Sequence, residues 1–185
     1  MTNKIKRKPR RPVYPTPAGL VVSIDAAGKP NIITLGEIFN LSIREPVWVG
    51  IAIREANYSH RLVKEQGEFT VNLPTAAMLA AVQGCGRCSG RDGVDKFTRF
   101  NLTPLPSKYV KPPIIAECPV NPECKVVGFH HVADHDLFIG EVLLEHVDAD
   151  KVNAAGERDE SKLDPLIWLG RGFYRLGEKI GEHRW

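Results

Sequence analysis

Apolar residues fall mostly in short runs with the length of β-strands. Leu20–Ile24 reads LVVSI, and Asn31–Leu35 follows it across the turn-forming segment Asp25–Pro30. Val47–Ile53, VWVGIAI, is apolar almost throughout, and Glu68–Leu73 resumes the pattern after a polar interval. Short apolar runs bounded by glycine, proline, asparagine and aspartate are typical of strands. The N-terminal half is therefore predicted to supply four strands.

Two longer strands are predicted in the second half of the chain. Cys124–Val132 and Leu137–Val147 are separated by the polar segment Ala133–Asp136, which is the pattern of an antiparallel hairpin. Pro165–Leu169 and Phe173–Leu176 add two short apolar pieces. Since strands dominate and helices are few and short, the predicted fold class is mainly β, a β-barrel with small helical additions.

Two short helices are predicted between the strands. The first covers His60–Glu65, and the second covers Ala76–Gln83, with Thr75 as its N-cap and Gly84 as its terminating residue. A long irregular segment, Gly84–Lys111, follows the second helix. Loops of this length in a compact domain are usually functional or mobile.

Charge is distributed unevenly along the chain. Six of the 25 basic residues lie in a proline-rich arm, residues 1–17, and we assign residues 18–185 to one domain. The arm could contact nucleic acid or a membrane, but packing on its own domain or on a partner subunit is favoured. The chain lacks a signal-peptide core and a run of about 20 apolar residues. We therefore expect a cytoplasmic protein without nucleic-acid or membrane partners.

The segment from the second strand to the first helix could hold an anion. It combines strand ends, a polar corner at Gly36–Arg44, Arg54 and a helix start, where N–H groups carry partial positive charge. One interpretation is a site for a phosphate-bearing cofactor. The alternative is that Ser59 caps its helix, Thr34 pairs in the sheet and Arg54 is a solvated charge.

The four cysteines, Cys85, Cys88, Cys118 and Cys124, allow three interpretations. A CxxC pair can be a redox dithiol or half of a zinc site, but the pair at 118 and 124 has too wide a spacing for a zinc ribbon. Reduced, packed thiols are favoured. The histidines show no HExxH spacing, so no metal site is predicted.

Other candidate chemistry is less specific. His130 and His131 are adjacent in a strand, so only one of them can face a site. The pair Lys96-Phe97 could present a cation and a flat apolar face to a conjugated ring, or simply anchor a loop. The sequence has no P-loop, GxSxG or Rossmann glycine motif, so a nicotinamide cofactor would bind without a dedicated dinucleotide fold.

Seven motifs, in order, resemble the flavin reductase-like proteins with an FMN-binding split barrel, the flavoredoxin group in particular. The resemblance covers about Pro15 to Gly181, and its motifs are PNIITLG, LSIREPVWVGIAI, SHRLVKEQGEFTVNLP, CGRCSGRDGVDKF, PPIIAECPVNPECKVV, DHDLFIGEVLLEHVD and LGRGFYRLGE. The resemblance implies a Greek-key split β-barrel, a homodimer with FMN near the subunit interface, and a redox function in the cytoplasm.

The resemblance also implies site residues by motif position. Those along the flavin ring and ribityl chain are Thr34, Leu35, Gly36 and Asn40. Those at or near the phosphate are Ser42, Arg54, Ser59 and His60. Those closing over the cofactor or lying near its ring are Ser89, Lys96, Phe97 and Tyr174. Our own candidates for catalytic residues are Lys96, which would stabilise reduced flavin, and, of the His130–His131 pair, His131, which would flank the hydride path.

One departure concerns the corner after the Thr34 strand. Many members of the group have a tryptophan there, and this chain has Ile38 or Phe39 instead. The resemblance then implies weaker flavin stacking, so FMN could dissociate as a substrate.

Two functions follow from the resemblance. The first is an oxidoreductase in which NAD(P)H reduces FMN and electrons pass to a redox protein or monooxygenase. The second is an electron carrier that retains FMN and is reduced by a protein donor, with no site for NAD(P)H. A split barrel that binds haem or a pyridoxal phosphate compound is a weaker alternative.

Overall fold

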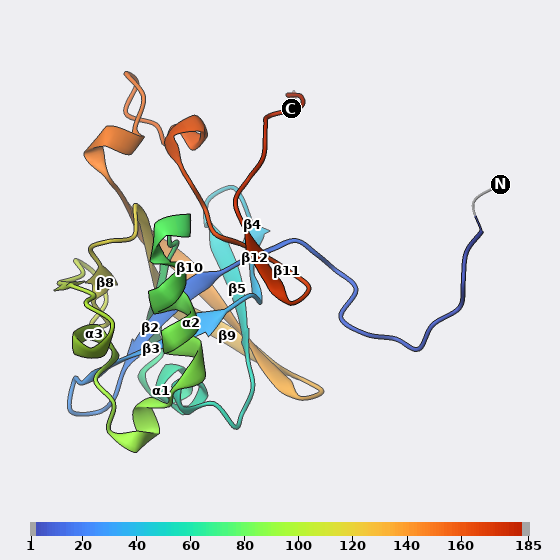
Figure 1. Ribbon diagram of the computed structural model, residues 1–185. Helices are drawn as coiled ribbons and strands as arrows, with labels where there is room; N and C mark the ends of the chain where they lie inside the picture. Colours follow the sequence, from blue (N-terminus) through green and yellow to red (C-terminus); the bar gives the residue numbers. More distant parts are fainter. Residues whose placement is uncertain (1–2, 183–185) are drawn as a thin grey trace.

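The computed structural model describes residues 3–182, and its main element is a seven-stranded antiparallel sheet (Figure 1). The strands, in spatial order, are β3 (Pro30–Leu35), β2 (Gly19–Ile24), β6 (Glu68–Asn72), β9 (Val120–Val132), β10 (His135–Val147), β5 (Trp48–Ile53) and β4 (Ile38–Ser42). All six neighbouring pairs are antiparallel.

The sheet curls into a half-barrel because its two edge strands are consecutive in sequence. β3 ends at Leu35 and β4 begins at Ile38, although five strands separate them in the sheet. Such a short connection can join opposite edges only if the sheet bends until those edges approach each other. The predicted mainly β, split-barrel class is confirmed.

Two small sheets flank the barrel. β1 (Thr16–Pro17) pairs with β11 (Ile167–Leu169), which pairs with β12 (Gly172–Tyr174). β7 (Pro104–Leu105) pairs with β8 (Ile114–Ile115). Of residues 3–17, only Thr16 and Pro17 are in a sheet. The start of the arm is exposed and extends away from the barrel (Figure 1), whereas Arg11 forms an ion pair with Glu37.

Within residues 3–182, three α-helices and four 3₁₀ turns flank the strands. The α-helices are α1 (Tyr58–Gln66), α2 (Leu79–Arg87) and α3 (Lys96–Arg99). The 3₁₀ turns are η1 (Ala76–Met78), η2 (Gly90–Asp92), η3 (Ala149–Lys151) and η4 (Glu160–Lys162). None of the helices in the described part of the chain is long and apolar enough to cross a membrane.

Two local predictions were wrong. Gly84 does not end its helix, because α2 continues to Arg87 and Gly84 instead allows a close approach by Phe100: a Cβ there would lie 2.3 Å from the ring atom Cε1. The predicted polar corner Gly36–Arg44 contains a strand, β4, which pairs with β5. The apolar side chains of Phe39 and Leu41 in β4 are exposed, so this strand lacks the usual alternation of buried apolar and exposed polar residues.

The apolar residues form two core clusters, one on each face of β2. Leu20 and Val22 pack with Val82 and other residues beneath α2, while Val21 packs inside the barrel with Phe69 and others. Successive side chains of a strand point to opposite faces, so a strand covered on both faces is apolar throughout. This explains why β2 is almost continuously apolar from Leu20 to Ile24, with Ser23 as its polar residue.

Gly140 in β10 is predicted to be required for packing inside the barrel. A Cβ there would lie 2.5 Å from Cζ of Phe69, which is fully buried. Gly140→Ala is expected to lower the free energy of unfolding by about 1–3 kcal/mol through overpacking. Gly128→Ala on β9 is the control, since its Cβ would meet nothing closer than 3.9 Å. Equal urea midpoints for the two variants would contradict the prediction.

Candidate functional site

A pocket of about 610 Å³ lies between β3, the start of α1 and the segment from the end of α2 to α3. These three parts of the chain are far apart in the sequence, so the barrel and its helices create the pocket together. Its lining is mostly polar, with backbone as well as side chains exposed to the space. The lining residues used below are Asn31, Thr34, Asn57, Ser59, Gly86, Arg87, Cys88, Ser89, Arg91, Asp92, Lys96 and Arg99.

A buried polar pair lies at the base of this pocket. Asn31 Nδ2 donates a hydrogen bond of 2.7 Å to Ser59 Oγ, and both side chains are almost fully buried. Within residues 3–182, the amide oxygen of Asn31 has no hydrogen-bond partner. A buried acceptor left unpaired costs free energy unless a ligand or water satisfies it. The atom is closed off from solvent and Gly90 lies against it, so a ligand hydroxyl or water that pairs with it must enter beside Gly90.

The start of α1 faces the same pocket. The N-cap is Asn57, and no side chain of the described chain forms a capping hydrogen bond there. The interpretation of Ser59 as the N-cap is therefore wrong, because Ser59 lies inside the helix and accepts from Asn31. Uncapped first-turn N–H groups favour an anion.

The charge of the lining also favours an anion. Arg87, Arg91 and Arg99 contribute guanidinium groups, and Arg91 Nη2 lies 3.4 Å from the carbonyl oxygen of Ala56 at the helix start. Asp92 is the only carboxylate that the described residues contribute. Guanidinium groups bind phosphate through paired, charge-assisted hydrogen bonds.

Thr34 contributes to both the sheet and the pocket. It pairs with Leu20 in the ladder between β2 and β3, and its Oγ1 donates a hydrogen bond of 2.6 Å to the carbonyl oxygen of Val82 in α2. Gly86 lies opposite, where a Cβ would be 3.4 Å from Thr34 Cβ. The end of α2 therefore approaches β3 closely and forms one wall of the pocket.

Lys96 is buried beneath this wall rather than solvated. Its Nζ donates hydrogen bonds to the carbonyl oxygens of Ile32 (2.6 Å) and Cys85 (2.8 Å), and the residue is 4% exposed. Burial lowers the pKa of Lys96, while Cys88 and Cys85 act in the opposite direction. The ammonium group joins β3 to the end of α2, and so holds the pocket together.

Lys96→Met is expected to lower the free energy of unfolding by about 1–3 kcal/mol, because two buried carbonyls lose their donor. The exposed Lys125→Met is the control. Thermal unfolding monitored by circular dichroism measures the difference. A melting temperature equal to that of the control would show that Lys96 is not a structural donor.

The structure brings four of the residues implied by the resemblance to this pocket: Thr34, Ser59, Ser89 and Lys96. Asn40 and Ser42 line a different pocket, of about 810 Å³. Leu35 and Phe97 are buried in the two core clusters.

The other implied residues lie away from the pocket as well. Arg54 forms an ion pair of 3.1 Å with Asp134. Gly36 packs beside Trp168 and Arg11, where a Cβ would lie 2.9 Å from each. Tyr174 is half-exposed on β12. These assignments stay predictions, since a partner subunit could complete the site near them.

Several lining residues were not predicted from the sequence, chiefly Asn31, Gly86, Arg87 and Arg91. Asn31 had a detectable signal, because an asparagine is unusual in a strand that is otherwise apolar. The arginines had none, since exposed arginines are common and only the fold places these around one opening.

The buried cysteines are divided between the two core clusters. Cys85 and Cys118 are in the cluster beneath α2, and Cys124 is inside the barrel. All four are free thiols, and burial raises the pKa of Cys85 to about 12. Burial also raises the pKa of Cys118 and Cys124. Such thiols are poor nucleophiles and metal ligands at neutral pH.

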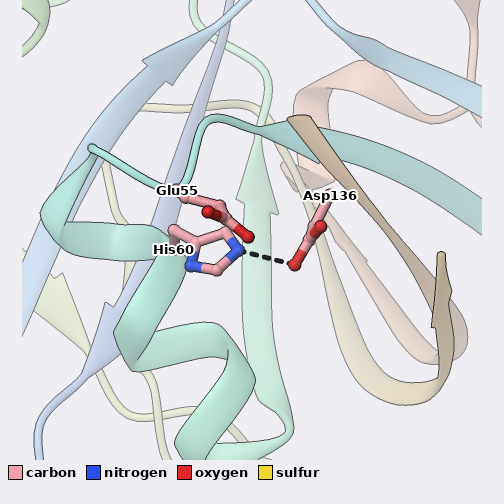
Figure 2. A group of neighbouring side chains, drawn as sticks. All are labelled: Glu55, His60 and Asp136. Atoms are coloured by element: carbon pink, nitrogen blue, oxygen red, sulfur yellow. Dashed lines mark hydrogen bonds and ion pairs between the residues drawn. The ribbon is translucent and has the colours of Figure 1, made fainter. Parts of the chain in front are cut away.

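The predicted catalytic residue His131 belongs to a second polar cluster, at the hairpin of β9 and β10. Asp136 accepts from His60 Nε2 (2.8 Å) and lies 2.9 Å from His131 Nδ1 and 3.4 Å from Lys64 Nζ. Figure 2 shows His60 and Asp136 facing each other, with Glu55 beside them. Hydrogen bonds from His60 and then His131 lower the pKa of Asp136 to about 2.

The half-barrel therefore has a polar pocket, lined by three arginines, beside its edge strand β3. Residues 10–177 match the family model described as the flavin reductase like domain. The chain belongs to this family.

Individual relatives agree with the family assignment. Flavoredoxin of Desulfovibrio vulgaris (Miyazaki F) has a similar structure, with a TM-score of 0.88, 31% identity and 97% coverage of both chains. An uncharacterized protein of Archaeoglobus fulgidus is 41% identical over 75% of this chain and 77% of its own. A NADH:riboflavin 5'-phosphate oxidoreductase of Streptomyces pristinaespiralis is 26% identical over 86% of this chain and 80% of its own.

Proposed function

We propose that the pocket at the start of α1 binds FMN and that the protein is a flavin-dependent oxidoreductase. The observation on which this rests is the buried Asn31–Ser59 pair, whose unpaired amide oxygen lies beside an uncapped helix start. FMN offers a matching pair of groups: ribityl hydroxyls can donate to Asn31, and the phosphate can accept from the helix N–H groups and from Arg91. The family membership and the polar, basic lining support the same ligand.

Bound FMN would supply the redox chemistry, since a flavin accepts hydride from NAD(P)H and releases electrons to an acceptor. The residues of the chain would bind and orient it. Arg87, Arg91 and the start of α1 would hold the phosphate. Thr34 and the backbone at Gly86 would form the wall that positions the rest of the molecule, and Lys96 would keep that wall in place.

The source of the electrons separates two versions of this function. An NAD(P)H-dependent reductase is supported by the relative from Streptomyces pristinaespiralis. A carrier reduced by a protein donor is supported by the structural similarity to flavoredoxin of Desulfovibrio vulgaris (Miyazaki F). The proposed electron acceptor is a redox protein or a monooxygenase component.

An absorption spectrum of the purified protein, before and after anaerobic addition of NADPH or NADH, tests the proposal. Yellow protein that bleaches supports the reductase. Yellow protein that stays oxidised supports the carrier. Colourless protein that also fails to bind added FMN would exclude both versions.

We also propose that the protein works as a homodimer in the cytoplasm. Apolar side chains are exposed on β4 (Phe39 and Leu41) and on β9 (Val127 and Phe129). Exposed apolar patches of this kind often mark protein interfaces. Light scattering after size-exclusion chromatography should give twice the mass of the chain for the wild type and a lower average mass for Phe129→Glu. A monomeric wild type would exclude the dimer.

A further inference from the structure

We propose that Glu55, His60, His131 and Asp136 form a binding site for one divalent transition-metal ion of the zinc class. This site is separate from the FMN pocket, and the proposal does not depend on FMN binding. The four residues come from three places in the sequence: the segment before α1, α1 itself and the hairpin of β9 and β10. The fold therefore assembles the group.

The distances fit a single ion. The ligand atoms of Glu55, His60 and Asp136 all lie within 4.8 Å of one another, with His60 Nε2 only 2.8 Å from Asp136 Oδ2. His131 Nδ1 lies 2.9 Å from Asp136 Oδ1 and 3.9 Å from Glu55 Oε1. Ligands about 2.0–2.2 Å from a zinc ion are about 3–4 Å from each other. Small side-chain movements would therefore complete the coordination.

Two of the four proposed ligands are preorganised by burial, and the other two are free to move. The Asp136 and His60 side chains are 2% and 8% exposed, so the surrounding structure holds them in place. Glu55 and His131 are 63% and 62% exposed, so they can rotate toward an ion without disturbing the core. A cavity of about 350 Å³ lies beside Glu55 and is also lined by Arg54 and Asp134.

Lys64 also approaches Asp136. Its Nζ lies 3.4 Å from Asp136 Oδ2, and the side chain is 44% exposed. A half-exposed lysine can move into solvent when a divalent ion replaces it. Lys64 is thus the expected competitor of the metal.

The chemistry of the ligands limits which ion can bind. Two imidazoles and two carboxylates suit zinc and neighbouring transition metals, while calcium and magnesium prefer oxygen ligands alone. A bound ion would tie Glu55 to the hairpin. Because Ala56 and Asn57 follow directly and line the FMN pocket, the ion would also stabilise one rim of that pocket.

Calorimetric titration of chelator-treated, full-length protein with zinc sulfate tests the proposal, in both FMN-free and FMN-supplemented samples. One zinc ion per chain is expected, with a higher melting temperature at saturation. Glu55→Gln and His131→Ala are each expected to weaken binding by about tenfold or more. Glu65→Gln on α1 and His130→Ala on β9 are the matched controls, and neither should change the affinity. Both test residues are exposed, so the variants should fold.

Three outcomes would overturn the proposal of a zinc site. The first is the absence of zinc binding by the wild type. The second is equal zinc affinity in the test variants and their controls. The third is zinc binding that survives Glu55→Gln and His131→Ala but is lost in Cys88→Ser, which would assign the metal to the thiols. Failure of FMN to bind would leave the FMN-free titration unaffected, so the two proposals fail independently.

Discussion

Asn31→Asp is expected to weaken FMN binding by about 30- to 150-fold, because it places a carboxylate at the base of an anion-binding pocket. Asn31 is buried beside Ser59 and the start of α1, where the phosphate is proposed to bind. Two like charges about 6–8 Å apart repel by about 2–3 kcal/mol at an effective dielectric constant of about 20. Asparagine and aspartate have the same shape, so the difference reports mainly charge.

Titration by quenching of flavin fluorescence measures the affinity. Riboflavin is the ligand control: it lacks the phosphate, so its affinity should fall much less. Asn40→Asp is the protein control, since Asn40 lines the other large pocket. If Asn40→Asp weakens FMN binding and Asn31→Asp does not, then the phosphate lies in the pocket that Asn40 and Ser42 line, as part of the motif resemblance implies.

Glu123→Ala is expected to lower the free energy of unfolding by about 3–5 kcal/mol, since it removes the centre of a buried hydrogen-bond network. Glu123 is fully buried in β9. Its carboxylate accepts from the backbone N–H groups of Lys108 (2.7 Å), Tyr109 (2.6 Å) and Val110 (3.2 Å). His146 Nε2 lies 2.6 Å away on β10. Without the carboxylate, these groups lose their partner.

Urea unfolding at neutral pH measures this loss, with Glu117→Ala as the matched control. Glu117 also accepts a backbone N–H, that of Thr103, but it is exposed, so water can replace it. The control should lose less than about 1 kcal/mol. A similar loss in both variants would show that burial does not determine the effect.

The contribution of Glu123 should also depend on pH. Burial by itself raises the pKa of Glu123, but the hydrogen bonds from His146 and from the backbone of residues 108–110 outweigh it, so the pKa lies below the ordinary value of 4.5. A lowered pKa in the folded state means that the stabilisation is complete above the unfolded-state pKa and is lost as pH falls through the folded-state value. The difference between wild type and Glu123→Ala should therefore shrink on acidification below about pH 4.5. A difference that stays constant would contradict this.

The sequence by itself determined most of the strands. The runs of β2, β3, β5 and β6 and the long hairpin of β9 and β10 follow from local alternation and turn residues, and the structure confirms them. The helix α1 was also predicted, to within two residues at its start. These elements were predictable because the pattern of burial repeats within the element.

Only the tertiary structure decided which side chains meet. Lys96 has the sequence context of a solvated lysine, yet it is buried because α3 packs against β3 and α2. His60 and Asp136 are 76 residues apart in the chain and 2.8 Å apart in the fold. The extension of α2 through Gly84 depends on Phe100, which packs against it from a later segment. Local periodicity specifies which face of an element is apolar, whereas the curl of the sheet specifies which polar residues share a pocket, and that curl depends on contacts between distant segments.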